Sequence, residues 1–167
     1  SGHCRQIFKD SATRLGAMIA NHDYHLVYGG MDAGLMGALA KSALKNGGNV
    51  TGIVPQKLKD SERVLQGLNA LIMVDDLWDR KQRMFEMADA VLALPGGFGT
   101  LDECLEMLYW AALKLHNKPL VLINIDEYFD PLIGYLHTLD DFDDRYLIVV
   151  DDVDGVQNAL KNWTPVV

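Results

Sequence analysis

Two glycine-rich turns hold the residues whose types and spacing are best suited to chemistry. Residues 28–37 read YGGMDAGLMG, and residues 94–103 read LPGGFGTLDE. Glycine lets a backbone approach a ligand closely, and a helix that begins at such a turn points free N–H groups at it. The second turn therefore has the properties of a phosphate site, where the Thr100 hydroxyl could cap the helix or bind the same phosphate. A plain strand-to-helix turn needs the same glycines, so both interpretations stay open. For the first turn, helix packing is favoured.

Charged side chains lie close to these turns. Glu103 and Glu106 are three residues apart and share one helix face, although an acid near a helix start is more often a partner of the helix dipole than a catalyst. Arg80, Lys81 and Arg83 form the one basic cluster in an acidic chain, at the start of an expected helix. Cations there oppose the helix dipole, which hints at a bound phosphate or carboxylate. A solvent-exposed face is the equal alternative.

Several other chemistries lack their residues. The second turn has neither the lysine of a P-loop nor the G-x-G-x-x-G spacing of a dinucleotide fold. The five histidines and the two cysteines, Cys4 and Cys104, show no metal-ligand spacing, and Cys104 is best interpreted as a small core residue. The acidic stretches 140–144 and 151–154 lack the calcium-loop pattern. The sequence therefore predicts no metal and no cofactor.

Composition sets the class of protein. The chain has 167 residues, 15 Lys and Arg against 23 Asp and Glu, a net charge of −8 and 49% hydrophobic residues. This length predicts one domain, residues 1–167. The negative charge argues against general nucleic-acid binding. No apolar run approaches the roughly 20 residues that span a bilayer, so no membrane partner is expected. Two cysteines without a disulfide framework favour the reducing cytoplasm.

Apolar runs alternate with helical patterns along the whole chain. The expected strands are residues 25–28, 50–54, 70–74, 90–94, 119–123 and 146–150. The expected helices lie near residues 5–20, 34–46, 79–88, 100–116, 129–138 and 153–162. Nearly continuous apolar strands are typical of a parallel sheet buried on both faces. The alternation predicts an α/β fold, a Rossmann-like doubly wound parallel sheet, with both glycine turns at the carboxyl ends of strands, where ligands bind.

The motifs in these segments resemble those of a known family. Residues 95–103 are similar to the PGGxGTxxE signature of the Lonely Guy family of cytokinin riboside 5′-monophosphate phosphoribohydrolases, which are often mislabelled lysine decarboxylases. Arg80-Lys81-x-x-Met84 resembles the family's RKxxM, 23 residues before Glu103, and residues 28–37 resemble its YGGGxxGLMG. The resemblance covers about residues 11–136.

The resemblance implies hydrolysis of the N-glycosidic bond of a nucleoside 5′-monophosphate, AMP or an N6-modified AMP, to a free base and ribose 5-phosphate. It places the family's catalytic residues on Arg80 and Glu103. A carboxylate suits this reaction because cleavage passes through an oxocarbenium-like state, and an arginine fork suits phosphate or ribose oxygens. The substrate-binding residues that it implies are Gly29, Gly30, Glu62, Lys81, Gly96, Gly97, Phe98, Gly99, Thr100 and Tyr109.

The resemblance also implies a homodimer with sites near its interface, for which the apolar helix 104–115 is a candidate. That helix could equally be buried inside the monomer. The family's first strand is expected before the beginning of this chain. Met31 replaces a family glycine, which puts a left-handed conformation there in question, and Tyr109 replaces a substrate-contacting threonine. The alternative function is a non-catalytic carrier of a nucleotide or of molybdenum cofactor, which needs no Arg/Glu pair. A lysine decarboxylase would need pyridoxal phosphate and a large cofactor domain, and is disfavoured.

Overall fold

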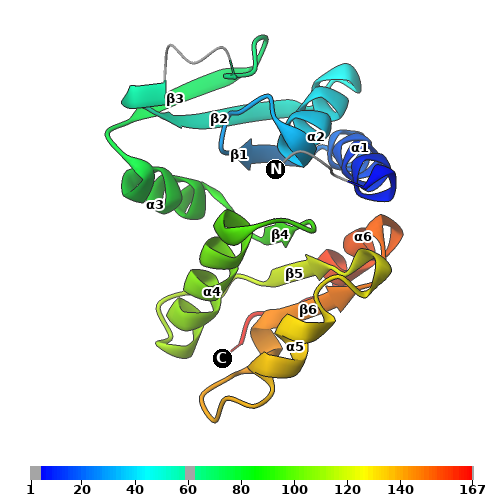
Figure 1. The fold of residues 1–167 in the computed structure, drawn as a ribbon, viewed down its shortest axis with the longest axis vertical. Helices are drawn as coiled ribbons and strands as arrows, with labels where there is room; N and C mark the ends of the chain where they lie inside the picture. The colour runs from blue at the N-terminus through cyan, green and yellow to red at the C-terminus, as the bar shows by residue number, and fades with distance from the viewer. Residues whose placement is uncertain (1–4, 59–62, 167) are drawn as a thin grey trace. The chain divides into compact units, whose positions relative to one another are not determined.

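The computed structural model describes residues 5–58 and 63–166, in which strands and helices alternate (Figure 1). The chain divides into two compact units, Ser1–Ala88 and Asp89–Val167. Each unit holds a three-stranded sheet in which every strand pairing is parallel, flanked by helices. The predicted α/β class with parallel sheets is confirmed.

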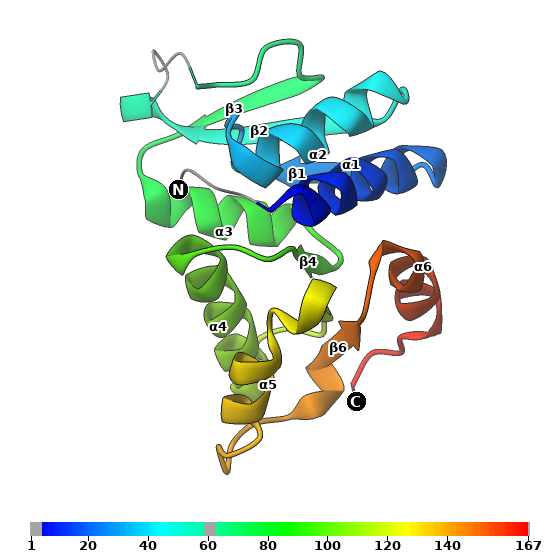
Figure 2. The ribbon, with the colours of Figure 1, turned by 45° about the vertical axis from the view of Figure 1, so that its right-hand side comes forward.

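The first unit orders its strands β1-β2-β3, with β2 in the centre. Val50, Ile53 and Val54 of β2 are fully buried because that strand has a neighbour on either side. The helices α1 and α2 run beside each other in both ribbon views (Figures 1 and 2), and α3 packs against all three strands. The elements are α1 (Gln6–Asn21), β1 (His25–Tyr28), α2 (Gly34–Lys45), β2 (Asn49–Pro55), a 3-10 turn (Gln56–Leu58), β3 (Ala70–Val74) and α3 (Leu77–Met87).

The crossing of α1 and α2 depends on a glycine. A Cβ atom built on Gly16 would lie 2.8 Å from the Ser42 Cβ and 2.9 Å from the Ala43 backbone nitrogen, and it would also collide with the Leu39 carbonyl oxygen. Two of these three atoms belong to the backbone, so a side-chain rotation cannot relieve the overlap. The Ser42 hydroxyl, which donates to the Thr13 carbonyl at 2.6 Å, ties the helices together at the same level.

Gly16→Ala is therefore expected to destabilise the fold by about 1–3 kcal/mol, the usual cost of overpacking. Gly134 of α5 is the matched control, since a Cβ atom there meets nothing within 4 Å. Gly134→Ala should instead stabilise by up to about 1 kcal/mol, because alanine is the better helix former. Denaturant midpoints of the two variants measure the effect. Equal midpoints would contradict the tight crossing.

The second unit orders its strands β4-β5-β6, and the central strand β5 is buried along its whole length. Side chains of α4, β5 and α5 share one apolar core with Phe129 and Tyr146. In contrast, the outer strand β6 has no fully buried residue, so the expectation of strands buried on both faces holds for the central strands only. The elements are β4 (Val91–Ala93), α4 (Phe98–Ala112), β5 (Leu120–Ile123), a 3-10 turn η2 (Ile125–Glu127), α5 (Asp130–Leu136), a 3-10 turn (Asp144–Tyr146), β6 (Leu147–Val150) and α6 (Val153–Asn162).

Candidate functional site

Arg80 lies against the first glycine turn of its own unit. A Cβ atom built on Gly29 would be 3.2 Å from the Arg80 Nη1 and 3.7 Å from its Cζ, so the guanidinium rests on the Gly29 backbone at the carboxyl end of β1. The Nε of Arg80 is buried, although the side chain as a whole is only half-buried. The structure thus brings together two residues that the sequence analysis singled out separately.

The glycine turn after β1 is held by a segment 30 residues further along the chain. The Asp32 N–H donates to the Arg63 carbonyl at 2.5 Å, and the Leu65 N–H donates to the Gly30 carbonyl at 3.0 Å. Gly30 takes the left-handed φ of 75° that this turn needs. Met31 has no positive φ and forms an isolated bridge with Val64, so the replacement of a family glycine by Met31 costs no backbone strain. Nothing in the sequence pattern pointed to the contact with residues 63–65.

The start of α3 is capped in a way that offsets its basic residues. The Asp76 side chain accepts hydrogen bonds from the Trp78 and Asp79 N–H groups at 2.8 and 3.0 Å. An N-cap aspartate and an acid in the first turn interact favourably with the helix dipole. The sequence analysis placed the cations at the start of the helix, but in the structure the acids come first. The signal was present as Asp-x-x-Asp before the helical pattern.

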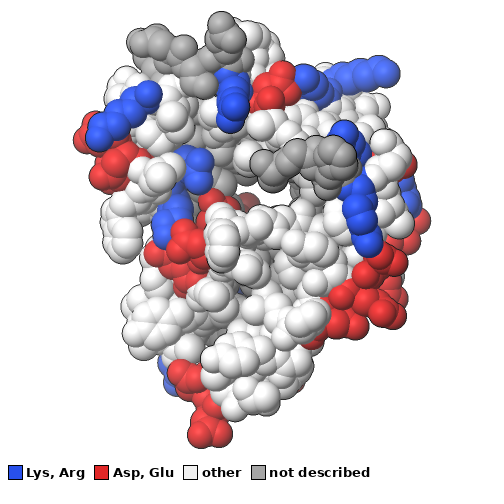
Figure 3. All heavy atoms as spheres, in the orientation of Figure 1, with Lys and Arg blue, Asp and Glu red and all other residues white. Residues whose placement is uncertain are grey.

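The three cations of α3 have different surroundings. Lys81 Nζ lies 5.7 Å from the centre of the Trp78 ring, a cation–π contact. Arg83 pairs with Glu86 one turn along at 3.5 Å, on an exposed face. Figure 3 shows basic side chains gathered over α3. The solvent-exposed interpretation therefore suits Arg83, whereas Arg80 turns to the glycine turn.

The Tyr28 hydroxyl, next to Gly29, is buried, and it makes no hydrogen bond among the described residues. Burial raises its pKa well above the ordinary value, with the nearby Asp32 carboxylate adding to the shift. The hydroxyl therefore keeps its proton at neutral pH. Asp32 itself is paired with Lys41 at 2.7 Å.

In the second unit, the glycine turn leads directly into α4. The helix begins after Gly97, and no side chain caps its first turn. One interpretation of the sequence made Thr100 the N-cap of this helix, but Gly97 occupies that position. The Thr100 hydroxyl lies on Gly96, because a Cβ atom there would collide with the Thr100 Oγ1. Cβ atoms on Gly97 and Gly99 would meet nothing within 4 Å, and Phe98 between them is 92% exposed. The start of α4 thus has no side-chain cap and leaves space beside Gly97 and Gly99, as an anion site requires.

Glu103 stands in the second turn of α4, half-buried beside the apolar core. The next residue, Cys104, is a buried free thiol, 2% exposed, as the sequence predicted. Burial raises the Cys104 pKa to about 12, and the Glu103 charge contributes to the rise. A thiol with such a pKa is not a nucleophile at neutral pH.

The exposed side of α4 is apolar. Leu105, Tyr109 and Leu113 follow at helical spacing and are 44%, 60% and 51% exposed. Tyr109 was predicted to bind the substrate, and within its own unit it points to this exposed face rather than into the core. Glu62, another predicted substrate contact, lies outside the described residues.

His116 fastens the end of α4 to the start of β5. Its Nε2 donates to the Met107 carbonyl at 2.9 Å, while its Nδ1 accepts from the Lys118 N–H at 3.0 Å. The second contact requires the neutral ring, because a protonated Nδ1 cannot accept a hydrogen bond. Burial lowers the His116 pKa, and the Lys118 charge lowers it further, against the opposing effect of the Met107 hydrogen bond.

The pH dependence of folding should reflect this histidine. Below its ordinary pKa of 6.5 the unfolded chain binds a proton that the folded chain refuses, so stability should fall as the pH falls from 7 to 5. His116→Gln is expected to flatten this part of the profile. His137→Gln, which changes an exposed histidine of the same unit, serves as control and should leave the profile unchanged. Denaturant unfolding at several pH values tests both. A steep profile retained in His116→Gln would refute the assignment.

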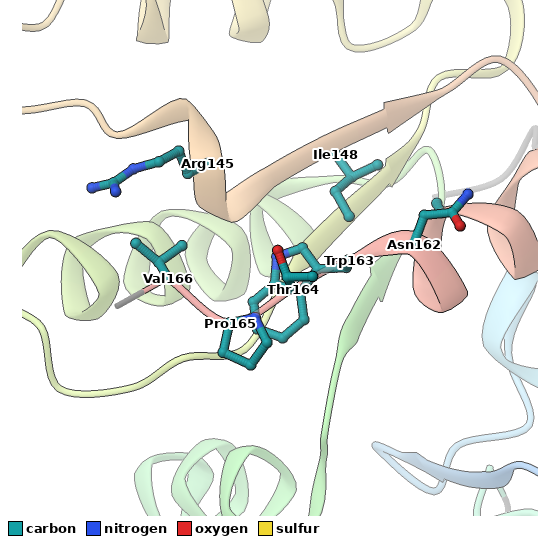
Figure 4. Close-up of a pocket in the computed structure, with 8 residues that line it drawn as sticks. Arg145, Ile148, Asn162, Trp163, Thr164, Pro165 and Val166 are labelled. Atoms are coloured by element: carbon teal, nitrogen blue, oxygen red, sulfur yellow. The ribbon is translucent and has the colours of Figure 1, made fainter.

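A surface pocket of about 590 Å³ lies elsewhere in the second unit (Figure 4). It is lined by residues of the 3-10 turn Asp144–Tyr146, of β6, of α6 and of the segment after α6, among them Arg145, Ile148 and Trp163. None of the predicted site residues lines it, so it is not the candidate substrate site.

Within residues 5–58 and 63–166, no three His, Cys, Asp or Glu side chains converge as metal ligands would. In the same part of the chain, no helix has the length and apolarity to cross a bilayer.

Known structures share this fold. The molybdenum cofactor carrier protein from Chlamydomonas reinhardtii matches with a TM-score of 0.74 and 24% identity, over 95% of this chain and 89% of the other. The molybdenum cofactor binding protein of Rippkaea orientalis matches with a TM-score of 0.72 and 21% identity, over 95% and 89% of the two chains. At such low identity these likenesses establish the fold alone.

Sequence relatives are closer. A rice protein named "Probable cytokinin riboside 5'-monophosphate phosphoribohydrolase LOGL1" is 41% identical over 78% of this chain, which spans 58% of that relative. The enzyme of Rhodococcoides fascians named "Cytokinin riboside 5'-monophosphate phosphoribohydrolase" is 41% identical over 90% of this chain and 80% of its own length. An Arabidopsis thaliana relative of the same activity is 39% identical over 79% of this chain, which spans 58% of it. The chain thus spans about three fifths of the two plant relatives.

The family described as "Possible lysine decarboxylase" matches residues 36–160, which include Arg80, Glu103 and the second glycine turn. The match covers most of the chain, and it agrees with the resemblance that the PGGxGTxxE and RKxxM motifs show. The chain therefore belongs to this family, the Lonely Guy family of the phosphoribohydrolases named above.

Proposed function

We propose that this protein hydrolyses the N-glycosidic bond of a nucleoside 5′-monophosphate, AMP or an N6-modified AMP, giving a free base and ribose 5-phosphate. The bond from C1′ to the base nitrogen breaks, water supplies the hydroxyl to C1′, and a proton goes to the base. The observation that carries the proposal is the second glycine turn: a helix start without a side-chain cap, with space beside Gly97 and Gly99 and with Glu103 one turn further along. The names of the relatives agree with it.

Each site residue has a role in this reaction. The N–H groups of residues 97–100 and the Thr100 hydroxyl would bind the 5′-phosphate. The Glu103 carboxylate would stabilise the cationic ribose or activate the water. Arg80, with Lys81 beside it, would orient the substrate and neutralise its charge. The proposal treats residues 1–167 as one nucleotide-binding domain.

Incubation with AMP, N6-isopentenyl-AMP, GMP and CMP, followed by chromatography for free base, tests the proposal. The matching nucleosides are the controls. Base release from a monophosphate but not from its nucleoside is the expected result. Tight nucleotide binding without base release from any of the four would favour the carrier function instead. The alternative has the support of a shared fold only, and a carrier needs neither Arg80 nor Glu103.

A homodimer is part of the same proposal. Its support is the exposed apolar surface formed by Leu105 and Tyr109 of α4 and by Leu113, the residue after its end. Light scattering coupled to gel filtration should give twice the chain mass of 18.6 kDa, and a monomer would count against the dimer.

We propose the cytoplasm as the compartment, supported by the buried free thiol of Cys104.

A further inference from the structure

A tyrosine far along the chain contacts the second glycine turn. The Tyr128 hydroxyl donates a hydrogen bond of 2.7 Å to the Gly96 carbonyl, across 32 residues of sequence. The ring is 42% exposed and packs edge-on against Phe129, whose ring is buried in the core of the unit. The Tyr128 ring therefore packs against Phe129 of the core, while its hydroxyl contacts the second glycine turn.

The turn that presents this tyrosine is built against local preference. Asp126 and Glu127 have φ values of 56° and 57°, a left-handed conformation that residues other than glycine rarely adopt. The buried side chain of Asn124 holds the turn: it accepts from the Phe129 N–H and donates to the Asp130 carboxylate, both at 2.7 Å. Two consecutive strained residues persist only where the surroundings fix them, so the direction of Tyr128 is well determined.

The Gly96 carbonyl, which accepts the hydrogen bond from Tyr128, lies at the start of the second glycine turn. Gly96 also lies under the Thr100 hydroxyl, one of the expected phosphate donors. The peptide between Gly96 and Gly97 carries the Gly97 N–H, since a carbonyl and the next N–H belong to one planar group. A hydrogen bond that fixes the Gly96 carbonyl therefore also fixes the direction of the Gly97 N–H. It fixes the backbone against which the Thr100 hydroxyl lies as well.

We propose that Tyr128 is a positioning residue for phosphate binding: its hydroxyl fixes the Gly96–Gly97 peptide so that the turn presents its donors to the substrate's 5′-phosphate. The inference rests on the proposed function for the identity of the ligand. Tyr128 acts through the turn and need not touch the phosphate. Its effect should therefore fall on the binding of any phosphorylated ligand and spare the ribose and the base.

Tyr128→Phe tests this inference, because it removes only the hydroxyl and keeps the ring on Phe129. Loss of one hydrogen bond to the turn should raise the KM for AMP by about threefold to tenfold and leave kcat nearly unchanged. The Kd of ribose 5-phosphate, measured by calorimetry, should rise by the same factor. Tyr135→Phe, on the 61% exposed tyrosine of α5, is the matched control and should change neither value.

The outcomes separate this inference from the proposed function. Unchanged KM and Kd in Tyr128→Phe, or a lower kcat at constant KM, would overturn the positioning role while leaving the enzyme intact. If the wild-type protein releases no base yet binds ribose 5-phosphate, the proposed function fails, and a higher Kd in Tyr128→Phe would still uphold the positioning role. A wild-type protein that releases no base and binds no ribose 5-phosphate would overturn both. Thermal unfolding should show the variant folded.

Discussion

Glu103→Gln should lower base release from AMP by about 10²- to 10⁴-fold while the protein stays folded. The amide has nearly the shape of the carboxylate and can still hydrogen-bond to a ribose hydroxyl. It carries no charge to stabilise a cationic ribose, and it cannot take a proton from water. The loss should therefore appear in kcat, with a much smaller change in KM. Chromatographic rates over a range of AMP concentrations measure the two constants separately.

Glu106→Gln is the control, since it changes a carboxylate of the same helix three residues further from the turn. It should retain the wild-type rate. A Glu103→Gln protein that keeps more than about a tenth of the wild-type kcat would show that the carboxylate only binds ribose or serves the helix dipole. An equal loss in both variants would indicate damage to α4 rather than to a reacting group.

The regular elements could be predicted from the sequence because apolar periodicity and turn residues are local signals. The strands at 25–28 and 70–74 have the predicted bounds, and the helix at 153–162 does too. The errors have particular causes. The helix expected near 79–88 begins at Leu77 because Asp76 caps it, and the helix expected to reach 116 ends at Ala112. There Lys114 turns left-handed, and His116 binds back to the Met107 carbonyl.

The contacts that complete the site could not be predicted from the sequence. The Tyr128 hydroxyl meets Gly96 across 32 residues, and no period or motif couples these two positions. The same holds for residues 63–65, which fix the turn at Gly30 by backbone hydrogen bonds available to any residue type. The motifs located the side chains proposed to react, whereas the contacts that surround them are set by tertiary packing. For Arg80, the sequence motif identified the residue, but it did not predict that the guanidinium contacts the Gly29 backbone.

Arg80→Ala should lower kcat/KM for AMP by about 10²- to 10³-fold, the usual cost of removing one preorganised charged donor. The guanidinium lies on the Gly29 backbone at the carboxyl end of β1, where ligands bind in parallel sheets. Arg80→Lys keeps the charge but loses the planar fork, and should recover only part of the loss. The Kd values of AMP and adenosine, measured by calorimetry in the variant and the wild type, show which oxygens the fork holds. A fork on phosphate weakens the binding of AMP alone, whereas a fork on ribose weakens the binding of both ligands.

Arg83→Ala is the matched control for Arg80→Ala, because Arg83 stands on the same helix and pairs with Glu86 on the exposed face. Removing it changes the net charge of the chain by the same amount and should leave kcat/KM nearly unchanged. A similar loss in the two variants would mean that α3 attracts the substrate through its overall positive charge, with salt weakening the effect. A loss confined to Arg80, and insensitive to salt, would mean that one fixed guanidinium binds the substrate.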